Sequence, residues 1–75
     1  MPKLTAEQLK IAFGNNPDGV AHALGESLRE FGYPITNDWV KEEITSQLKG
    51  EKPRGLGPAL FIQGWLKDGF DELDE

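Results

Sequence analysis

The sequence predicts an all-α fold, a compact single domain of four short helices. Apolar residues recur every three or four positions along most of the 75 residues, which is the spacing of one helix face. Gly, Pro, Asn and Thr stand where such helices would begin and end. Only one short apolar run could be a strand, and it has no second strand to pair with. A domain this small buries only about 60% of its unfolded surface, so little apolar surface can be idle.

The first helix is expected over residues 6–13. Thr5 and Gln8 have the spacing of a capping box, in which each side chain accepts a hydrogen bond from the backbone of the other residue. Gly14 follows the last apolar position and is expected to end the helix in a left-handed cap.

The second helix is expected over residues 17–31. Asn16 is a suitable N-cap, and Pro17 fits the first helical position, where its missing N–H has no consequence. Gly32 fits the end of the helix, and Pro34 prevents it from continuing.

The third helix is expected over residues 37–49, between Thr36 as N-cap and Gly50 as terminator. Its outer face is expected to be acidic, carrying Asp38, Glu42 and Glu43.

The fourth helix is expected over residues 58–68, with Pro58 at its start and Gly69 at its end. This segment is ambiguous, because the apolar run 60–62 also fits a strand and Gly64 lowers helix propensity by about 1 kcal/mol relative to Ala. Helix is preferred, because a lone strand would leave its backbone groups unpaired.

The domain is expected to span residues 1–70, with 71–75 as a flexible acidic tail. Its centre is predicted from the apolar positions of the four helices. These are Leu9, Phe13, Val20, Leu24, Leu28, Phe31, Val40, Ile44, Leu48, Phe61, Ile62, Trp65 and Leu66.

The composition restricts the function classes. The formal net charge of -5 disfavours nonspecific binding to nucleic acid, which depends on Lys and Arg contacts to phosphates. There is no cysteine, which excludes disulfides and thiolate chemistry and allows a reducing compartment. No apolar run approaches the ~20 residues that span a bilayer, and residues 1–5 lack the apolar core of a signal peptide. A cytoplasmic protein without membrane contact is expected.

The connector 49–58 carries Lys49, Lys52 and Arg54 among Gly and Pro residues, just before the most apolar segment. Backbone N–H groups at the start of the following helix could bind an anion there. The connector lacks the Gly-Lys-Ser or Gly-Lys-Thr sequence of a nucleotide-binding loop. A solvated connector is therefore the preferred interpretation, with anion or nucleic-acid binding as the alternative.

Three large apolar residues fall outside the predicted stripes: Ile11, Trp39 and Leu60. They either flank a small core or form an exposed patch for a partner, and the shortness of the chain favours the core. Gly64 fits close helix approach either within one molecule or between two.

No catalytic site is predicted. His22 is the only histidine, and Ser27 lies five residues beyond it, a poor spacing for contact along one helix. His22 is expected to be a partly exposed helix residue. The acidic residues near the end of the chain lack the loop of a calcium site, so neither a metal nor a cofactor is expected.

The segment 24–34 and the helix after it resemble the helix–extended turn–helix of SAP-type nucleic-acid-binding modules. The resemblance rests on Leu24, Leu28, Gly32 and Tyr33. It would imply nucleic-acid binding, but the sequence departs from the family pattern at 37–39, and the following helix is acidic. No family is assigned.

The sequence thus favours a small non-enzymatic protein-interaction or accessory module. Its contact surface would consist of the helices at 37–49 and 58–68 and the connector between them. The candidate anchors are Trp39, Arg54, Leu60 and Trp65. The partner would be another protein or a second copy of the chain.

Overall fold

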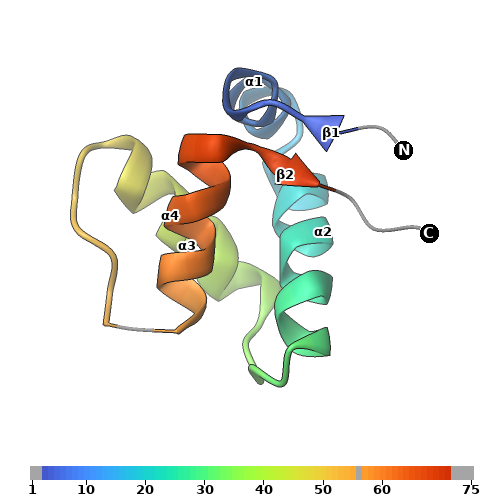
Figure 1. Cartoon of the computed structure of the whole chain (residues 1–75), viewed down its shortest axis with the longest axis vertical. Helices are drawn as coiled ribbons and strands as arrows, with labels where there is room; N and C mark the ends of the chain where they lie inside the picture. Colours follow the sequence, from blue (N-terminus) through green and yellow to red (C-terminus); the bar gives the residue numbers. More distant parts are fainter. Residues whose placement is uncertain (1–2, 56, 72–75) are drawn as a thin grey trace.

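The computed structural model of the protein describes residues 3–55 and 57–71. It confirms the all-α fold (Figure 1). The described elements are β1 (Lys3–Leu4), α1 (Ala6–Asn15), α2 (Pro17–Glu30), α3 (Asn37–Leu48), α4 (Pro58–Asp68) and β2 (Phe70–Asp71). The fourth segment is a helix, as predicted.

The predicted N-caps are confirmed. The Gln8 N–H donates to the Thr5 hydroxyl at 3.1 Å, and the Thr5 N–H donates to the Gln8 side-chain oxygen at 3.0 Å. Asn16 and Thr36 each accept a hydrogen bond from the backbone N–H three residues later, at 3.2 and 3.1 Å. These bonds satisfy donors that a helix start otherwise leaves unpaired.

The predicted end of α1 is wrong. Gly14 lies inside the helix, which continues to Asn15, and it does not adopt a positive φ. The chain turns instead at Asn16, whose N–H donates to the Ala12 carbonyl at 2.8 Å while its side chain caps α2. Asn16 is therefore both the C-cap of α1 and the N-cap of α2, so no further residue between the two helices acts as a glycine cap.

Glycines end α2 and α4 as predicted. Gly32 has φ +100°, and the Tyr33 N–H donates to the Leu28 carbonyl at 3.1 Å, the long bond of a Schellman ending. Gly69 has φ +105°, and a Cβ there would lie 2.5 Å from the Leu4 carbonyl oxygen. Only glycine fits both the conformation and the space at position 69.

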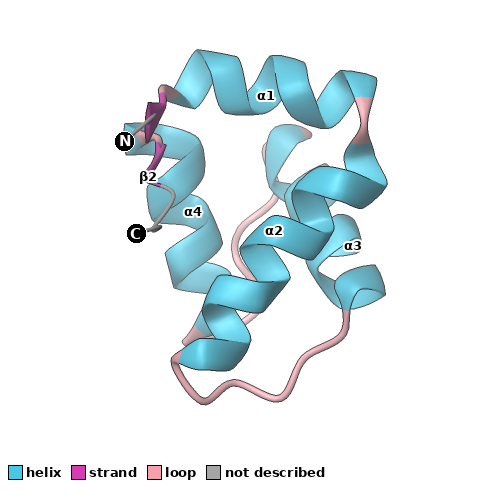
Figure 2. Ribbon diagram, turned by 90° about the vertical axis from the view of Figure 1, so that its right-hand side faces the viewer, coloured by secondary structure: helices cyan, strands magenta, loops and turns pink. Residues whose placement is uncertain are grey.

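The close approach at Gly69 reflects a short antiparallel ladder that the sequence does not predict. Leu4 pairs with Phe70 and Lys3 with Asp71. Figure 2 shows the two strands beside the C-terminal end of α4. Asp71 thus belongs to β2, and the rest of the predicted acidic tail, 72–75, lies outside the described residues.

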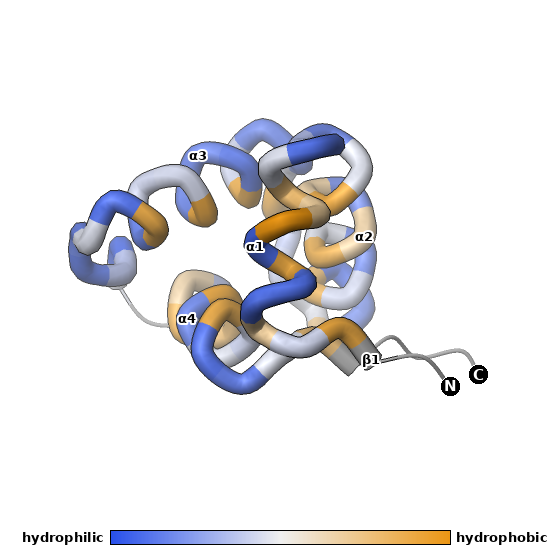
Figure 3. Tube along the Cα trace, turned by 90° about the horizontal axis from the view of Figure 1, so that it is seen from above, coloured by the Kyte–Doolittle hydropathy of each residue, from blue (hydrophilic) through white to orange (hydrophobic). Residues whose placement is uncertain are grey.

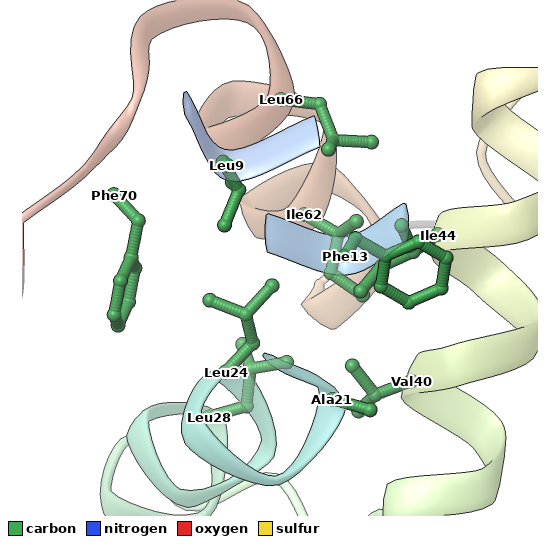
Figure 4. Close-up of a cluster of buried hydrophobic side chains, with 10 residues drawn as sticks. All are labelled: Leu9, Phe13, Ala21, Leu24, Leu28, Val40, Ile44, Ile62, Leu66 and Phe70. Atoms are coloured by element: carbon green, nitrogen blue, oxygen red, sulfur yellow. The ribbon is translucent and has the colours of Figure 1, made fainter. Parts of the chain in front are cut away.

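The core lies where the four helices meet (Figures 3 and 4). Its buried apolar residues are Leu9, Phe13, Ala21, Leu24, Leu28, Val40, Ile44, Ile62, Leu66 and Phe70. Ala59 is also fully buried. Val20, Trp39 and Trp65 are partly buried and pack against this cluster.

Three residues predicted in the centre are exposed instead: Phe31 by 61%, Leu48 by 41% and Phe61 by 37%. The buried face of α2 consists of Ala21, Leu24, Gly25 and Leu28, and at Gly25 this face lies close to α3. A Cβ on the buried Gly25 would lie 2.9 Å from Asn37 Oδ1. Phe31 then follows the last helical residue, at the C-cap, beyond the buried face.

Candidate functional site

The connector between α3 and α4 is attached to the domain by Glu43. This side chain was expected on the outer face of α3, but it is completely buried. The Arg54 Nε–H donates to Glu43 Oε1 at 2.6 Å, and the Arg54 backbone N–H donates to Oε2 at 3.2 Å. Gln47 Nε2 donates to Oε2 at 2.7 Å and also to the Ala59 carbonyl at 3.1 Å. We call Glu43, Gln47 and Arg54 the Glu43 clamp.

The Glu43 carboxylate is charged although it is buried. Burial raises the pKa of this carboxyl, but the hydrogen bonds from Gln47 and Arg54 and the guanidinium charge outweigh burial. The pKa of Glu43 is therefore held below its ordinary value. A buried charge is tolerated when it is paired and hydrogen-bonded in this way.

Trp39 completes the surroundings of Arg54. The guanidinium carbon lies 5.0 Å from the centroid of the indole ring, within the range of a cation–π contact. The nearby Glu42 carboxylate is 3.9 Å from Arg54 Nη2, a long contact that is mostly exposed. Arg54 therefore stacks on one partner and hydrogen-bonds to another within its own chain.

This geometry weakens the predicted anion site. The Arg54 side chain is still 47% exposed, but its Nε and its backbone N–H are both bound to a carboxylate. Lys49 and Lys52 are exposed, and no ion pair involves either of them in the described part of the chain. Of these three basic residues, Arg54 is thus bound to Glu43, whereas Lys49 and Lys52 form no ion pair within residues 3–55 and 57–71.

Aromatic side chains form a second feature along α4. Phe31 stacks on Phe61 with ring centroids 5.0 Å apart and planes 13° apart, and Tyr33 meets Phe61 edge-on at 5.9 Å. Phe61 contacts Trp65 at 5.9 Å, and Trp65 meets Phe70 edge-on at 5.0 Å. We call these five residues the aromatic row. It runs from the buried Phe70 to the exposed Phe31.

The outward face of α4 continues this apolar surface. Leu60 is 43% exposed, which contradicts the preference for a core position, and the same holds for Ile11 at 59% on α1. Gly64 follows Leu60 by one turn, and a Cβ there would meet no atom of the described residues within 4 Å. Helical spacing places these two α4 residues on the side opposite the core.

The four predicted anchors separate into two pairs. Trp39 and Arg54 contact each other at the Glu43 clamp. Leu60 and Trp65 lie on α4, where Leu60 is exposed and Trp65 is partly buried against the core. The prediction omitted Phe31 and Phe61, because both follow the apolar spacing of their helices. The position of Phe31 directly before the helix-ending Gly32 is the one local signal of its exposure.

His22 is an exposed residue of α2, as expected, with a side chain that is 57% exposed. Its Nδ1 lies 3.1 Å from Asn37 Nδ2, and its Nε2 lies 3.3 Å from a Glu26 carboxylate oxygen. Within residues 3–55 and 57–71, no hydrogen bond joins His22 to a serine. This arrangement contains no activated nucleophile.

The described ranges hold no group of three or more His, Asp or Glu side chains placed to bind a metal ion. None of the described helices has the length and apolar content that crossing a membrane requires. No family model matches the chain, and neither a curated protein nor a solved structure matches it.

Proposed function

We propose that the chain is a small non-enzymatic protein-interaction module whose contact surface is centred on α4. The observation that carries this proposal is the exposure of Phe31, Leu60 and Phe61 in a domain of only 75 residues. A chain this short normally needs its large apolar side chains in the core. Aromatic residues are also enriched at the centres of protein interfaces.

The Glu43 clamp supports the proposal indirectly. It fixes the connector to α3 a few residues before α4 begins, at Arg54. A surface held in place before binding loses less conformational entropy when a partner docks. The clamp therefore serves the contact surface as a support, and Arg54 is not proposed as an anchor.

Anion or nucleic-acid binding is not favoured as a second function. Arg54 is already bound to Glu43, and the remaining Lys49 and Lys52 belong to a chain of net charge -5. Affinity for phosphates depends on the number of cations brought to them. A cytoplasmic location belongs to the same proposal, and the absence of cysteine is compatible with it.

Site-specific photocrosslinking tests the proposed surface. A photoreactive phenylalanine analogue would replace Phe61, Phe31 or, as control, Ile11, which is equally apolar and exposed but lies on α1. The proteins would be irradiated in an extract of the cells that make the chain. Discrete crosslinked species are expected from positions 31 and 61 and not from position 11. Equal crosslinking at all three positions, or none at any, would contradict the proposal.

A further inference from the structure

A row of polar contacts joins α2 to the first turns of α3. Asn37, the first residue of α3, places its side-chain Nδ2 3.1 Å from Nδ1 of His22 on α2. On the other side of the imidazole, Nε2 lies 3.3 Å from a carboxylate oxygen of Glu26. One helical turn away along both helices, Lys41 Nζ donates to Asp18 at 3.0 Å. His22 therefore lies between a neighbour on its own helix and a neighbour on α3.

The two contacts of the imidazole determine which ring nitrogen carries the proton. A carboxylate only accepts hydrogen bonds, so the contact with Glu26 requires a proton on Nε2 of His22. In the neutral ring Nδ1 then keeps a lone pair and accepts from the side-chain N–H of Asn37. The structure thus contains His22 in its neutral form, with Asn37 as the donor.

The oxygen of the same amide is unpaired. Asn37 Oδ1 is buried and has no hydrogen-bond partner in the described part of the chain. It lies against Gly25 of α2, where a Cβ would be only 2.9 Å away. A side chain at position 25 would obstruct this end of the amide, and glycine removes the obstacle. Most buried polar side-chain atoms have a partner, so an unpaired oxygen here needs an explanation.

We propose that His22 and Asn37 form a pH-sensitive switch in the contact between α2 and α3. Histidine is the side chain that ordinarily changes its charge between about pH 5 and about pH 8. When the half-exposed His22 takes a proton from water, both ring nitrogens carry hydrogen, and Nδ1 no longer accepts from Asn37. A half-turn of the amide then brings the unpaired Oδ1 to the Nδ1–H and restores the hydrogen bond in the opposite direction. Nε2 donates to Glu26 in both states.

Acidic groups near the ring favour its protonated form. Glu26 is in contact with the ring, and Asp18 lies one turn earlier on the same helix. Opposite charges within a few ångströms stabilise a protonated imidazole. On α3, Asp38 follows Asn37 directly, whereas Lys41 opposes protonation but is paired with Asp18. Glu26 is therefore the main partner of the protonated ring.

Arg29 acts against the turn of the amide. Its guanidinium donates to the Ile35 carbonyl at 3.0 Å and lies, like Asn37 Oδ1, beside Gly25. A guanidinium only donates hydrogen bonds, so it is a better neighbour for the amide oxygen than for the amide nitrogen. From α1 and α4, which pack on the buried face of α2, no charged group forms an ion pair with His22 within residues 3–55 and 57–71. The amide thus turns only when protonation removes its present acceptor.

Heteronuclear NMR of the full chain tests the switch, and its single histidine makes the ring signals unambiguous. At about pH 8 the ring should carry its proton on Nε2, and a coupling through the hydrogen bond should join Nδ1 to Asn37 Nδ2. As the pH falls, that coupling should disappear, and the side-chain amide signals of Asn37 should shift with the same midpoint as the ring signals. The side-chain amide of Gln63, exposed on α4, is the control and should not follow this midpoint.

Two variants separate a turn of the amide from a simple loss of contact. His22→Gln keeps an acceptor that does not titrate, so the Asn37 amide signals should become independent of pH over the same range. Asn37→Ala removes the oxygen that accepts from the protonated ring. In acid its Nδ1–H should exchange with water several-fold faster than in the unchanged chain, because a hydrogen bond protects that proton. Thermal melts would verify that both variants are folded.

Three results overturn the inference. The first is a neutral ring with its proton on Nδ1, and the second is a set of Asn37 signals that do not follow the titration of the ring. The third is an exchange rate of the Nδ1–H in acid that Asn37→Ala leaves unchanged. The first two are measured on the unchanged chain and do not depend on the folding of any variant. None of them bears on the surface of α4, which photocrosslinking tests separately.

Discussion

The Glu43 clamp and the aromatic row differ in how their side chains use their own molecule. Arg54, in the basic connector, is held by Glu43 and lies over Trp39. Phe31 and Phe61 follow the apolar stripes of their helices, but their rings stack on each other and remain exposed. A residue's type thus indicates what it can bind, whereas its contacts within the chain decide whether it is free to do so.

The largest expected difference lies between the two ends of the aromatic row. Phe70 is 4% exposed and lies in the core, whereas Phe31 is 61% exposed. Phe70→Ala should lower the free energy of unfolding by about 3–5 kcal/mol. Phe31→Ala should lower it by about 1 kcal/mol or less, because it removes mainly one exposed stacking contact. Urea denaturation of both variants measures the two values, and equal losses would show that the row is uniformly structural.

Removal of the clamp carboxylate should have the next largest effect. Glu43→Ala should lower the free energy of unfolding by about 2–3 kcal/mol, since it removes hydrogen bonds from Arg54 and Gln47 to a charged group. The loss stays below that of a fully buried ion pair, because Arg54 is half-exposed and regains water. Glu42→Ala is the control and should change stability by less than about 0.5 kcal/mol. Similar losses in both variants would argue against a clamp.

Acid should weaken the clamp but not the aromatic row. The pKa of Glu43 is lower in the folded chain than the about 4.3 expected when unfolded. Its contribution is therefore complete above the unfolded pKa and is lost as the pH falls through the lower folded pKa. Glu43→Gln lacks this contribution. The stability difference between the two chains, from urea denaturation, should be up to about 2 kcal/mol near pH 7 and should shrink below about pH 4. A pH-independent difference would contradict this assignment.

Arg54→Lys should have a smaller effect than removal of the Glu43 carboxylate. Lysine keeps the charge near Glu43 but lacks the planar group that both hydrogen-bonds through Nε and stacks on Trp39. We expect a loss of about 1 kcal/mol in the free energy of unfolding. Thermal denaturation with Lys52→Arg as control separates a requirement for guanidinium geometry at position 54 from a general effect of charge. An unchanged Arg54→Lys melt would show that charge alone holds the connector.

The helices and most of their ends could be predicted, because local chemistry decides them. Thr5 with Gln8 and Thr36 mark helix starts, and Gly32 and Gly69 mark helix ends, whatever the rest of the chain does. The ladder between β1 and β2 could not be predicted, because a strand of two residues shows no periodicity in the sequence.

The candidate site was less predictable because its contacts are distant in sequence. Burial of Glu43 depends on Arg54, eleven residues later, returning across α3. Phe31 is exposed because it stands at the C-cap of α2, beyond the face that buries Ala21, Leu24, Gly25 and Leu28. Apolar periodicity alone ranks this phenylalanine as a core residue. Leu60 was correctly recognised as lying outside the stripe, but the preference for the core was wrong.

The pairing of Leu4 with Phe70 brings the beginning and the end of the described chain to one edge of the molecule. Paired strands lie about 5 Å apart, so a host polypeptide can enter at Lys3 and leave at Asp71 across a gap no wider than an ordinary loop. The fold therefore suits transplantation into a surface loop of another protein. In such a chimera the inserted domain would present the exposed face of α4 on the surface of the host protein.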